Sequence, residues 1–190
     1  TGNWSKTPNT HTAMSVFFQD GKSVHFNDPR HFGTIKFASD RRQLQKKLSE
    51  LGPDMLSKPP TPEEFRIAIS RQGSTNITQA LMNQKFISGV GNYVKAEALY
   101  RARISPWRSC SSLNLEDCVN LHSAIIAVLQ GSYRLGGATL ATYKDFEGSA
   151  GQFDKQLQVY RKAFDPEGHS VISEPTPDKR TTWWVKSLQK

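Results

Sequence analysis

The sequence predicts an α+β fold in which strands, helices and a small β-like tail follow one another along the chain. Three observations predict it. Apolar and polar residues alternate around turn signals within residues 1–40, helix start and stop signals recur through the middle of the chain, and short β-like runs alternate with turns from Val159 onward. The strands and helices are therefore segregated along the chain.

The first segment reads as β-structure. Apolar runs at 15–18 and 24–26 flank Asp20-Gly21, and Asp-Gly between two such runs is a strong hairpin signal. A turn at 27–30 follows, and the alternation beyond it predicts a further strand over 32–37.

Helices are predicted in the middle of the chain. Thr61, Pro62 and Glu64 form a capping-box sequence that starts one of them after a Pro-rich linker. Start and stop residues predict the others at about 42–51, from Ser74 or Thr75 to Lys85, from Asn92 as cap to about Arg101, and from Asn114 as cap to just before Gly136-Gly137. A loop is predicted over 142–152.

Composition narrows the class of partner. The chain of 190 residues carries 25 Lys and Arg against 17 Asp and Glu, a formal net charge of +8, with a pI of about 9.6. This balance fits a polyanionic partner such as nucleic acid, although a merely soluble basic protein can share it. No apolar run is long enough to span a bilayer, and Cys110 and Cys118 offer neither a disulfide framework nor a complete zinc site. An intracellular, reducing compartment is therefore expected.

A glycine turn between two helices suggests how such a partner is held. In QKFISGVGNYVKAEALYRARISP, residues 84–106, Gly89, Gly91 and Asn92 separate two apolar helical segments. Such a turn directs the N–H groups of a helix N-terminus at a phosphate, and its glycines let a nucleic-acid backbone approach closely. Lys95 and Arg103 would add attraction that does not depend on base sequence. An ordinary helical hairpin with a glycine turn is the alternative for the turn taken alone.

The longer string resembles the helix–two-turn–helix motif of the Fpg/Nei family of DNA glycosylases, which are base-excision repair enzymes. The residues that match its pattern in register are Gln84, Gly89, Gly91, Asn92, Glu97, Leu99, Ile104 and Pro106. The chain departs from the pattern at 93–95 on the second helix, which leaves the turn intact. The resemblance implies that Gly91 and Asn92 bind DNA phosphate.

A second string, Asp28-Pro29-Arg30-His31-Phe32-Gly33, resembles the DPRRFG string of the same family. The resemblance implies that Arg30 contacts the base opposite a flipped nucleotide and that Phe32 wedges into the gap in the stack. A surface arginine in a proline turn is the alternative. His11 lies at the spacing of a DNA-contacting histidine in the family, although an isolated loop histidine is more often solvated.

The tail resembles a zincless form of the family's C-terminal zinc finger. The spacing of two, sixteen and two residues is kept, but the four ligand positions hold Asp165, Gly168, Val185 and Leu188. Gly, Val and Leu cannot bind zinc, so no cofactor is expected. The resemblance then implies a Nei-like member of vertebrate, plant or giant-virus type, whose finger is held by apolar packing of Val171, Ile172, Trp183, Trp184, Val185 and Leu188.

The resemblance also assigns an arginine and a loop. Arg180 resembles the finger arginine that contacts phosphates on both sides of a lesion, where a bidentate group can hold a kinked backbone. The segment 136–140 resembles the start of the loop near the flipped base, which places Gly137 and Thr139 there. The implied domains are the remainder of a β-sandwich at 1–45, a linker at 46–58, a helix–two-turn–helix domain at 59–141, a lesion-proximal loop at 142–156 and the finger at 157–190.

The catalytic group of the family is an N-terminal proline whose amine attacks C1′ of the damaged nucleotide and forms a Schiff base, with a neighbouring glutamate as acid and base. The resemblance places both upstream of Thr1, so no residue of this chain is assigned to catalysis. A piece of a full enzyme is favoured over a truncated protein without the nucleophile.

The leading hypothesis is therefore a DNA glycosylase with AP lyase activity. Its expected partner is double-stranded DNA with oxidised bases or abasic sites, and no membrane. A monomer is expected, inside the cell with genomic DNA and in the nucleus if the source is eukaryotic. A non-catalytic DNA- or RNA-binding module with the same helical motif is the alternative, and a protein-binding scaffold is a remote third. The sequence leaves open whether an oxidised purine, an oxidised pyrimidine or a hydantoin is preferred.

Overall fold

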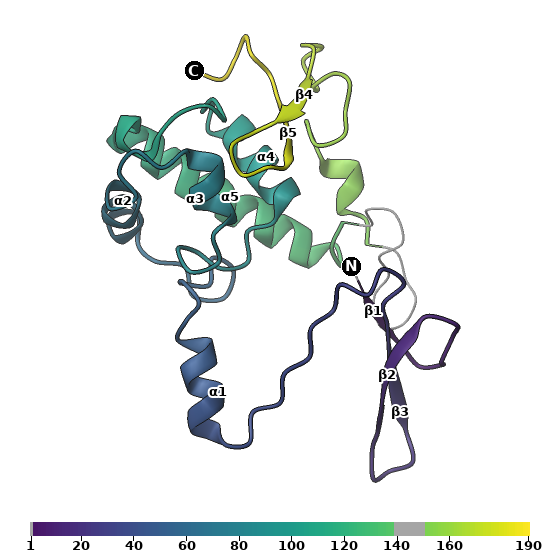
Figure 1. Cartoon of the computed structure of the whole chain (residues 1–190). Helices are drawn as coiled ribbons and strands as arrows, with labels where there is room; N and C mark the ends of the chain where they lie inside the picture. The colour runs from purple at the N-terminus through teal and green to yellow at the C-terminus, as the bar shows by residue number, and fades with distance from the viewer. Residues whose placement is uncertain (1, 139–150) are drawn as a thin grey trace. The chain divides into compact units, whose positions relative to one another are not determined.

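The computed structural model describes residues 2–138 and 151–190 (Figure 1). These residues divide into two compact units, one formed from residues within 1–39 and 132–156, the other from 40–131 and 157–190. Helices combine with two small antiparallel sheets, so the predicted α+β class is confirmed. None of the described helices combines the length and the apolar character needed to cross a bilayer.

The first unit contains a three-stranded antiparallel sheet. Its strands are β1 (Asn3–Ser5), β2 (Thr12–Phe17) and β3 (Ser23–Asn27), in the order β1-β3-β2. The predicted hairpin joins β2 to β3: Gly21 has a φ of +79°, and the N–H of Phe18 donates to the carbonyl of Lys22 at 2.9 Å. The hairpin predicted from Asp20-Gly21 is therefore confirmed. A local pattern is enough to predict it, because the residues of its turn are neighbours in sequence.

The strand predicted over 32–37 is wrong. These residues form no strand, and Phe32, Ile35 and Phe37 are exposed at 71%, 45% and 88%. A strand needs a neighbour for its N–H and C=O groups, and no described segment pairs with this one. Alternation alone therefore gave the wrong secondary structure.

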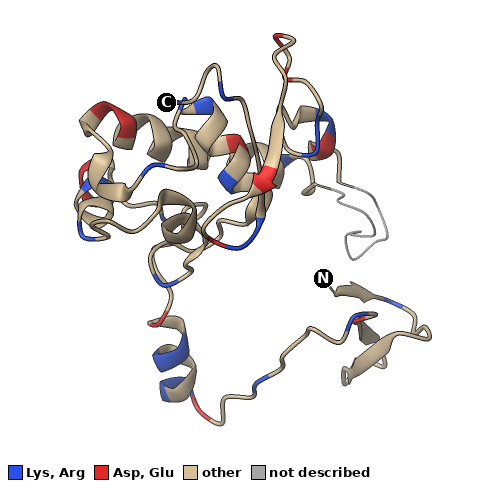
Figure 2. Ribbon diagram, turned by 45° about the horizontal axis from the view of Figure 1, so that its top comes forward, with Lys and Arg blue, Asp and Glu red and all other residues tan. Residues whose placement is uncertain are grey.

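The described α-helices lie in the second unit, except for the end of the last one. Their bounds are α1 (Arg41–Leu48), α2 (Pro62–Ser70), α3 (Ile77–Met82), α4 (Asn92–Arg101) and α5 (Leu115–Arg134), with short 3-10 turns η1 (Cys110–Ser112) and, in the first unit, η2 (Phe153–Gln156). No residue of α1 is buried, and its basic residues appear as blue bands in Figure 2: Arg41, Arg42, Lys46 and Lys47. α5 passes from the second unit into the first at Ser132.

Side-chain caps set several helix boundaries. The capping box of α2 is confirmed, because the N–H of Glu64 donates to Thr61 Oγ1 and the N–H of Thr61 donates to Glu64 Oε2. The cap of α5 is Asn114, as predicted, whose Oδ1 accepts from the N–H of Asp117 at 2.8 Å. The start predicted for α3 is wrong: Asn76 caps it, not Ser74 or Thr75. The helix also ends at Met82 rather than Lys85, because the chain turns at Asn83.

α4 lies at the centre of the second unit. Every residue from Val94 to Tyr100 is buried, including the charged side chains of Lys95 and Glu97. Burial of a charge is costly unless it is paired. The Glu97 carboxylate accepts the N–H groups of 158–160 at 2.9–3.0 Å, and this fixes the start of the C-terminal segment against the helix.

The C-terminal segment ends in a two-stranded antiparallel sheet of β4 (Ile172–Pro175) and β5 (Thr181–Trp184). Trp184 and Val185 are buried, and the ring centroid of Trp183 lies 4.5 Å from that of Tyr160. The sheet packs on α4 (Figure 1). We call residues 157–190 the finger.

Candidate nucleic-acid interface

The turn between α3 and α4 is held by one side chain inside it. Gln84 Nε2 donates to the carbonyl of Val90 at 2.9 Å, and Gln84 Oε1 accepts from the N–H of Gly89 at 3.1 Å. Gly89 has a φ of +89°, a conformation that favours glycine. The segment 52–54 supports the turn, since the N–H of Gly52 donates to the carbonyl of Gln84 at 2.8 Å. The turn is therefore a fixed structure that presents the start of α4.

Gly91 leaves the N-terminus of α4 open. Its backbone is extended, with a φ of −109°, and it occupies the cap position without a side chain to satisfy the first N–H groups. A Cβ at Gly91 would meet nothing within 4 Å. The N–H groups at a helix N-terminus attract anions, and the missing side chain leaves room for one. The geometry is thus suited to a phosphate.

The prediction that Asn92 caps α4 is wrong. The helix begins at Asn92, one residue after the extended Gly91, so its side chain cannot take the cap position. Its Nδ2 donates instead to the carbonyl of Thr181 at 3.0 Å, which joins α4 to β5. Its Oδ1 is buried and has no hydrogen-bond partner among the described residues. Asn92 therefore links the turn to the finger.

This link brings two predicted phosphate-binding residues onto adjoining segments. Arg180 directly precedes Thr181 and is exposed. The carbonyl of Thr181 accepts the Asn92 hydrogen bond across 89 positions of sequence. The open helix N-terminus at Gly91 and the Arg180 guanidinium group belong to segments held together by that bond. A backbone anion can be met by N–H groups and by a cation from these two segments.

The prediction that Lys95 attracts phosphate is wrong. Its side chain is fully buried, and Nζ lies 2.6 Å from Asp178 Oδ2. Burial lowers the pKa of Lys95, while the Asp178 carboxylate opposes that shift. Arg103 is exposed, as predicted, but pairs with Glu167 at 3.3 Å.

A carboxylate inside the 28–33 loop determines its shape. Asp28 Oδ2 accepts the N–H of Gly33 at 2.5 Å, and the carbonyl of Asp28 accepts the N–H of His31 at 3.1 Å. The hydrogen bond from Gly33 keeps the pKa of the Asp28 carboxyl below its ordinary value, against the effect of burial. Arg30 and Phe32 extend into solvent from this loop, with the guanidinium carbon of Arg30 5.3 Å from the Phe32 ring centroid. A short, fixed loop thus carries an exposed cation and an exposed aromatic ring.

His11 lies next to this loop. Its carbonyl accepts the N–H of Asp28 at 2.8 Å, and its own N–H donates to Asn9 Oδ1 at 2.8 Å. The imidazole is exposed. The structure therefore brings the predicted DNA-contacting histidine close to the loop of Arg30 and Phe32 within the first unit.

The glycine pair after α5 ends that helix. The N–H of Gly137 donates to the carbonyl of Ser132 at 2.8 Å, and that of Gly136 to Tyr133 at 3.2 Å, which is the Schellman pattern. Gly136 has a φ of +70°, the left-handed conformation that this pattern requires at its position, and Gly137 also has a positive φ. Thr139, also predicted for the lesion-proximal loop, and most of 142–152 lie outside the described residues.

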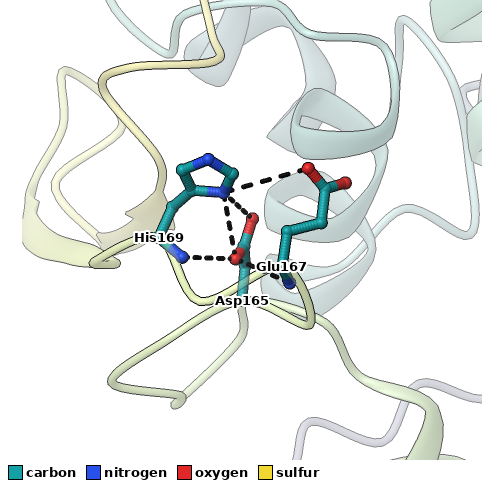
Figure 3. Close-up of side chains that lie close together, drawn as sticks. All are labelled: Asp165, Glu167 and His169. Atoms are coloured by element: carbon teal, nitrogen blue, oxygen red, sulfur yellow. Dashed lines mark hydrogen bonds and ion pairs between the residues drawn. The ribbon is translucent and has the colours of Figure 1, made fainter.

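Asp165 organises the first half of the finger (Figure 3). Its carboxylate accepts the hydroxyl of buried Tyr100 at 2.9 Å and the N–H groups of Glu167 and His169 at 3.0 and 2.7 Å. Burial and the Asp165 carboxylate raise the pKa of Tyr100 to about 12, so the hydroxyl stays a donor. Burial also disfavours ionisation of Asp165, but these hydrogen bonds outweigh it and hold its pKa below the ordinary value.

Asp165, Glu167 and His169 also lie close enough together to hold a metal ion, and in the described part of the chain they are the group that does so. Ligand atoms of Asp165, Glu167 and His169 lie within 4.8 Å of one another. Both oxygens of Asp165 already accept hydrogen bonds, and His169 Nδ1 lies 3.1 Å from Asp165 Oδ2. The side chains of this cluster therefore stabilise a turn through hydrogen bonds.

Besides Asp165, the three positions that match the zinc ligands of the family hold residues that cannot bind a metal. Gly168 has a φ of +86° and forms the turn, Val185 is fully buried, and Leu188 is partly buried. Sequence reasoning missed Gln189, whose Oε1 accepts the N–H of Val185 at 2.7 Å and whose Nε2 donates to the carbonyl of Ile104 at 2.8 Å. A glutamine near a chain end gives no signal of this role, because its partners are not marked by any local pattern.

Comparison with known proteins agrees with this geometry. Residues 51–144 match the family model described as the formamidopyrimidine-DNA glycosylase H2TH domain. A formamidopyrimidine-DNA glycosylase from Xanthomonas oryzae is 32% identical over 185 residues, which cover 96% of this chain and 68% of that protein. One from Wolbachia pipientis is 35% identical over 183 residues, covering 95% and 67%.

Solved structures share the fold. The MutM (Fpg) protein from Thermus thermophilus superposes with a TM-score of 0.86 at 31% identity, covering 99% of this chain and 72% of that one. A complex between the Lactococcus lactis Fpg and DNA containing an abasic site superposes with a TM-score of 0.84 at 25% identity, covering 100% and 71%. The similarity therefore extends over both units.

The lowered pKa of Asp165 predicts a pH-dependent finger. A depressed carboxyl pKa stabilises the fold above the ordinary value of about 4, and the contribution disappears as pH falls through the lowered value. We expect Asp165→Asn to lower the melting temperature at pH 7, and the gap to the parent to narrow below about pH 4. Thermal melts followed by fluorescence of the finger tryptophans measure it. Glu116→Gln, at an exposed carboxyl, is the control, and a gap that stays constant down to pH 3 contradicts the assignment.

Proposed function

The chain belongs to the formamidopyrimidine-DNA glycosylase family, and on that premise we propose that the protein removes oxidised bases from duplex DNA and then cuts the strand as an AP lyase. The observation that carries the proposal is the junction of Asn92 with Thr181, which puts the open N-terminus of α4 and Arg180 on adjoining segments. A protein that distorts a duplex must hold its backbone on both sides of the distortion, and these segments supply the donors.

Binding to the backbone rests on the second unit. Backbone N–H groups at Gly91, the amide of Asn92 and the Arg180 guanidinium contact phosphates without reading base sequence. Each cation that neutralises a phosphate releases counterions, so affinity falls as salt rises. His11 adds a phosphate contact from the first unit. The formal charge of +8 brings the protein to DNA before these contacts form.

Access to the damaged base rests on the loop of Asp28. A base inside a duplex must leave the stack before C1′ can be attacked, and this costs a few kcal/mol. Phe32, exposed at 71%, inserts into the gap and recovers roughly 2 kcal/mol by burying its ring. Arg30 donates to the base left unpaired. From the resemblance to the family, we propose that Gly137 and Thr139 take part in binding the flipped base.

For the chemical step we propose the proline and glutamate of the family, which match no residue of this chain. The proline amine attacks C1′ as the base departs, a Schiff base forms, and elimination breaks the strand, with the neighbouring glutamate moving protons. Residues of this chain hold the substrate during those steps. The similar relatives are formamidopyrimidine-DNA glycosylases, and one solved neighbour is a complex with DNA that contains an abasic site. For this protein we propose oxidised bases and abasic sites as the substrate class.

The finger supports a zincless, Nei-like member of the family. Asp165 and Gln189 make hydrogen bonds at the places where a metal would hold the turns, and Val185 packs where a thiolate would point. The protein acts as a monomer inside the cell with genomic DNA, and in the nucleus if the source is eukaryotic.

Borohydride trapping tests the enzyme proposal. Reduction of a Schiff base joins the protein covalently to DNA, so we expect a shifted band with lesion-containing duplex and none with an undamaged one. The full-length protein is required, and replacement of its N-terminal proline is the control. Tight, salt-dependent binding without an adduct would instead indicate a non-catalytic module built on the same helical motif.

The two groups of DNA contacts predict two classes of variant. Asn92→Ala and Arg180→Ala should weaken binding to damaged and undamaged duplex alike, and Arg180→Ala, which removes a charge, should also lower the salt slope by roughly one unit at most. Arg30→Ala and Phe32→Ala should mainly reduce base excision and opposite-base preference, because they act after the backbone is bound. Binding at several salt concentrations and single-turnover excision separate the classes. Four variants with the same profile would show that this division is wrong.

A finger held without zinc predicts insensitivity to chelation. Prolonged treatment with a strong zinc chelator should leave the melting temperature and the lesion binding of the full-length protein unchanged. Metal analysis of the purified protein should give much less than one zinc per chain. A chelator-sensitive relative with a four-cysteine finger serves as the positive control.

A further inference from the structure

We propose that the buried ion pair of Lys95 and Asp178 is a positioning device for Arg180, which fixes the tip of the finger against α4 so that the finger and the helix N-terminus grip the DNA backbone as one body. The inference rests on the proposed function. Neither residue reaches DNA itself, because the side chains of Lys95 and Asp178 are only 0% and 3% exposed.

Asp178 is bonded on two sides. Oδ2 lies 2.6 Å from Lys95 Nζ on α4, while Oδ1 accepts the hydroxyl of Thr176 at 2.6 Å within the turn. Asp178 therefore connects the helix to the turn through a single carboxylate. Arg180 follows it by two positions, so any displacement of Asp178 displaces the Arg180 backbone as well.

The turn of residues 176–180 that carries Arg180 needs such support. The N–H of Thr176 donates to the carbonyl of Arg180 at 3.1 Å, and Lys179 adopts a φ of +61°, which is unfavourable for a residue with a side chain. A hairpin of two strands is only marginally stable by itself. Its tip therefore depends on contacts to α4, among them the ion pair and the Asn92 bond to Thr181.

The pair also removes a competitor for the arginine. A free carboxylate two residues from Arg180 would attract the guanidinium group that phosphate needs. Lys95 occupies that carboxylate at 2.6 Å, and it does so from inside the protein. The net positive charge of the tip, from Lys179 and Arg180, then faces solvent.

The test uses the full-length protein and a fluorescent duplex with a tetrahydrofuran abasic-site analogue. Arg180→Ala should weaken binding about tenfold, the loss of one charge-assisted contact. Lys95→Met should weaken it by about the same factor and lower the salt slope, although Lys95 cannot touch DNA. In the Arg180→Ala background, Lys95→Met should add less than about twofold, because both changes remove the same contact.

A double substitution that replaces both charged residues of the pair by neutral ones keeps the test valid if Lys95→Met alone misfolds. Lys95→Met with Asp178→Asn leaves no unpaired buried charge, and such replacements usually keep a fold intact. We expect a loss of about threefold, since the competing carboxylate is gone but the tip is less firmly held. Lys22→Met is the control for Lys95→Met alone, because Lys22 forms an exposed ion pair with Asp20 at 2.8 Å and its loss makes the same change in charge as the loss of Lys95. It should bind as the parent does.

Each outcome decides a separate claim. If Arg180→Ala binds like the parent, the proposed phosphate contact itself is wrong. If Arg180→Ala weakens binding but the double substitution does not, or if the losses from Lys95→Met and Arg180→Ala multiply, the positioning role is wrong. An unchanged salt slope for Lys95→Met, with only a lower melting temperature, would assign the pair to stability alone.

Discussion

The burial of two opposite charges on α4 is the constraint on which the second unit depends. Glu97 and Lys95 lie two residues apart in a helix whose other buried side chains are apolar except for the hydroxyl of Tyr100. A helix of this kind can be buried only if each charge finds a partner, and both partners come from the C-terminal segment. Glu97 receives the backbone N–H groups of 158–160, and Lys95 receives Asp178. The requirement for charge pairing therefore fixes where the finger docks.

The pairing of these charges explains how the proposed phosphate-binding surface is assembled. The N-terminus of α4 is open because Gly91 has no side chain, yet a helix terminus alone makes a weak anion site. The pairing of α4 with the finger adds a guanidinium group on a segment more than eighty residues later in sequence. The surface is thus a product of tertiary structure, and its parts reinforce one another only when the finger is folded.

The sequence predicted what depends on neighbouring residues. The Asp20-Gly21 hairpin and the capping box of Thr61 and Glu64 involve partners within a few positions, so composition and spacing carry the signal. The bond from Asn92 to Thr181 and the pair of Lys95 with Asp178 span 89 and 83 positions. No local pattern encodes such a pair, which is why Asn92 was assigned as a cap and Lys95 as a surface cation. The strand expected at 32–37 failed for a related reason, since a strand is defined by a neighbour that the pattern does not contain.

The carboxylate at the centre of the first finger turn has a consequence for chemical durability. Thiolates that hold zinc are oxidised to disulfides or sulfenic acids, and a finger built on them opens when oxidants accumulate. Asp165 offers nothing to oxidise, and Cys110 and Cys118 are buried, with thiol pKa values raised first of all by that burial. The first turn of the finger is therefore held by a carboxylate and its hydrogen bonds, which hydrogen peroxide leaves unchanged.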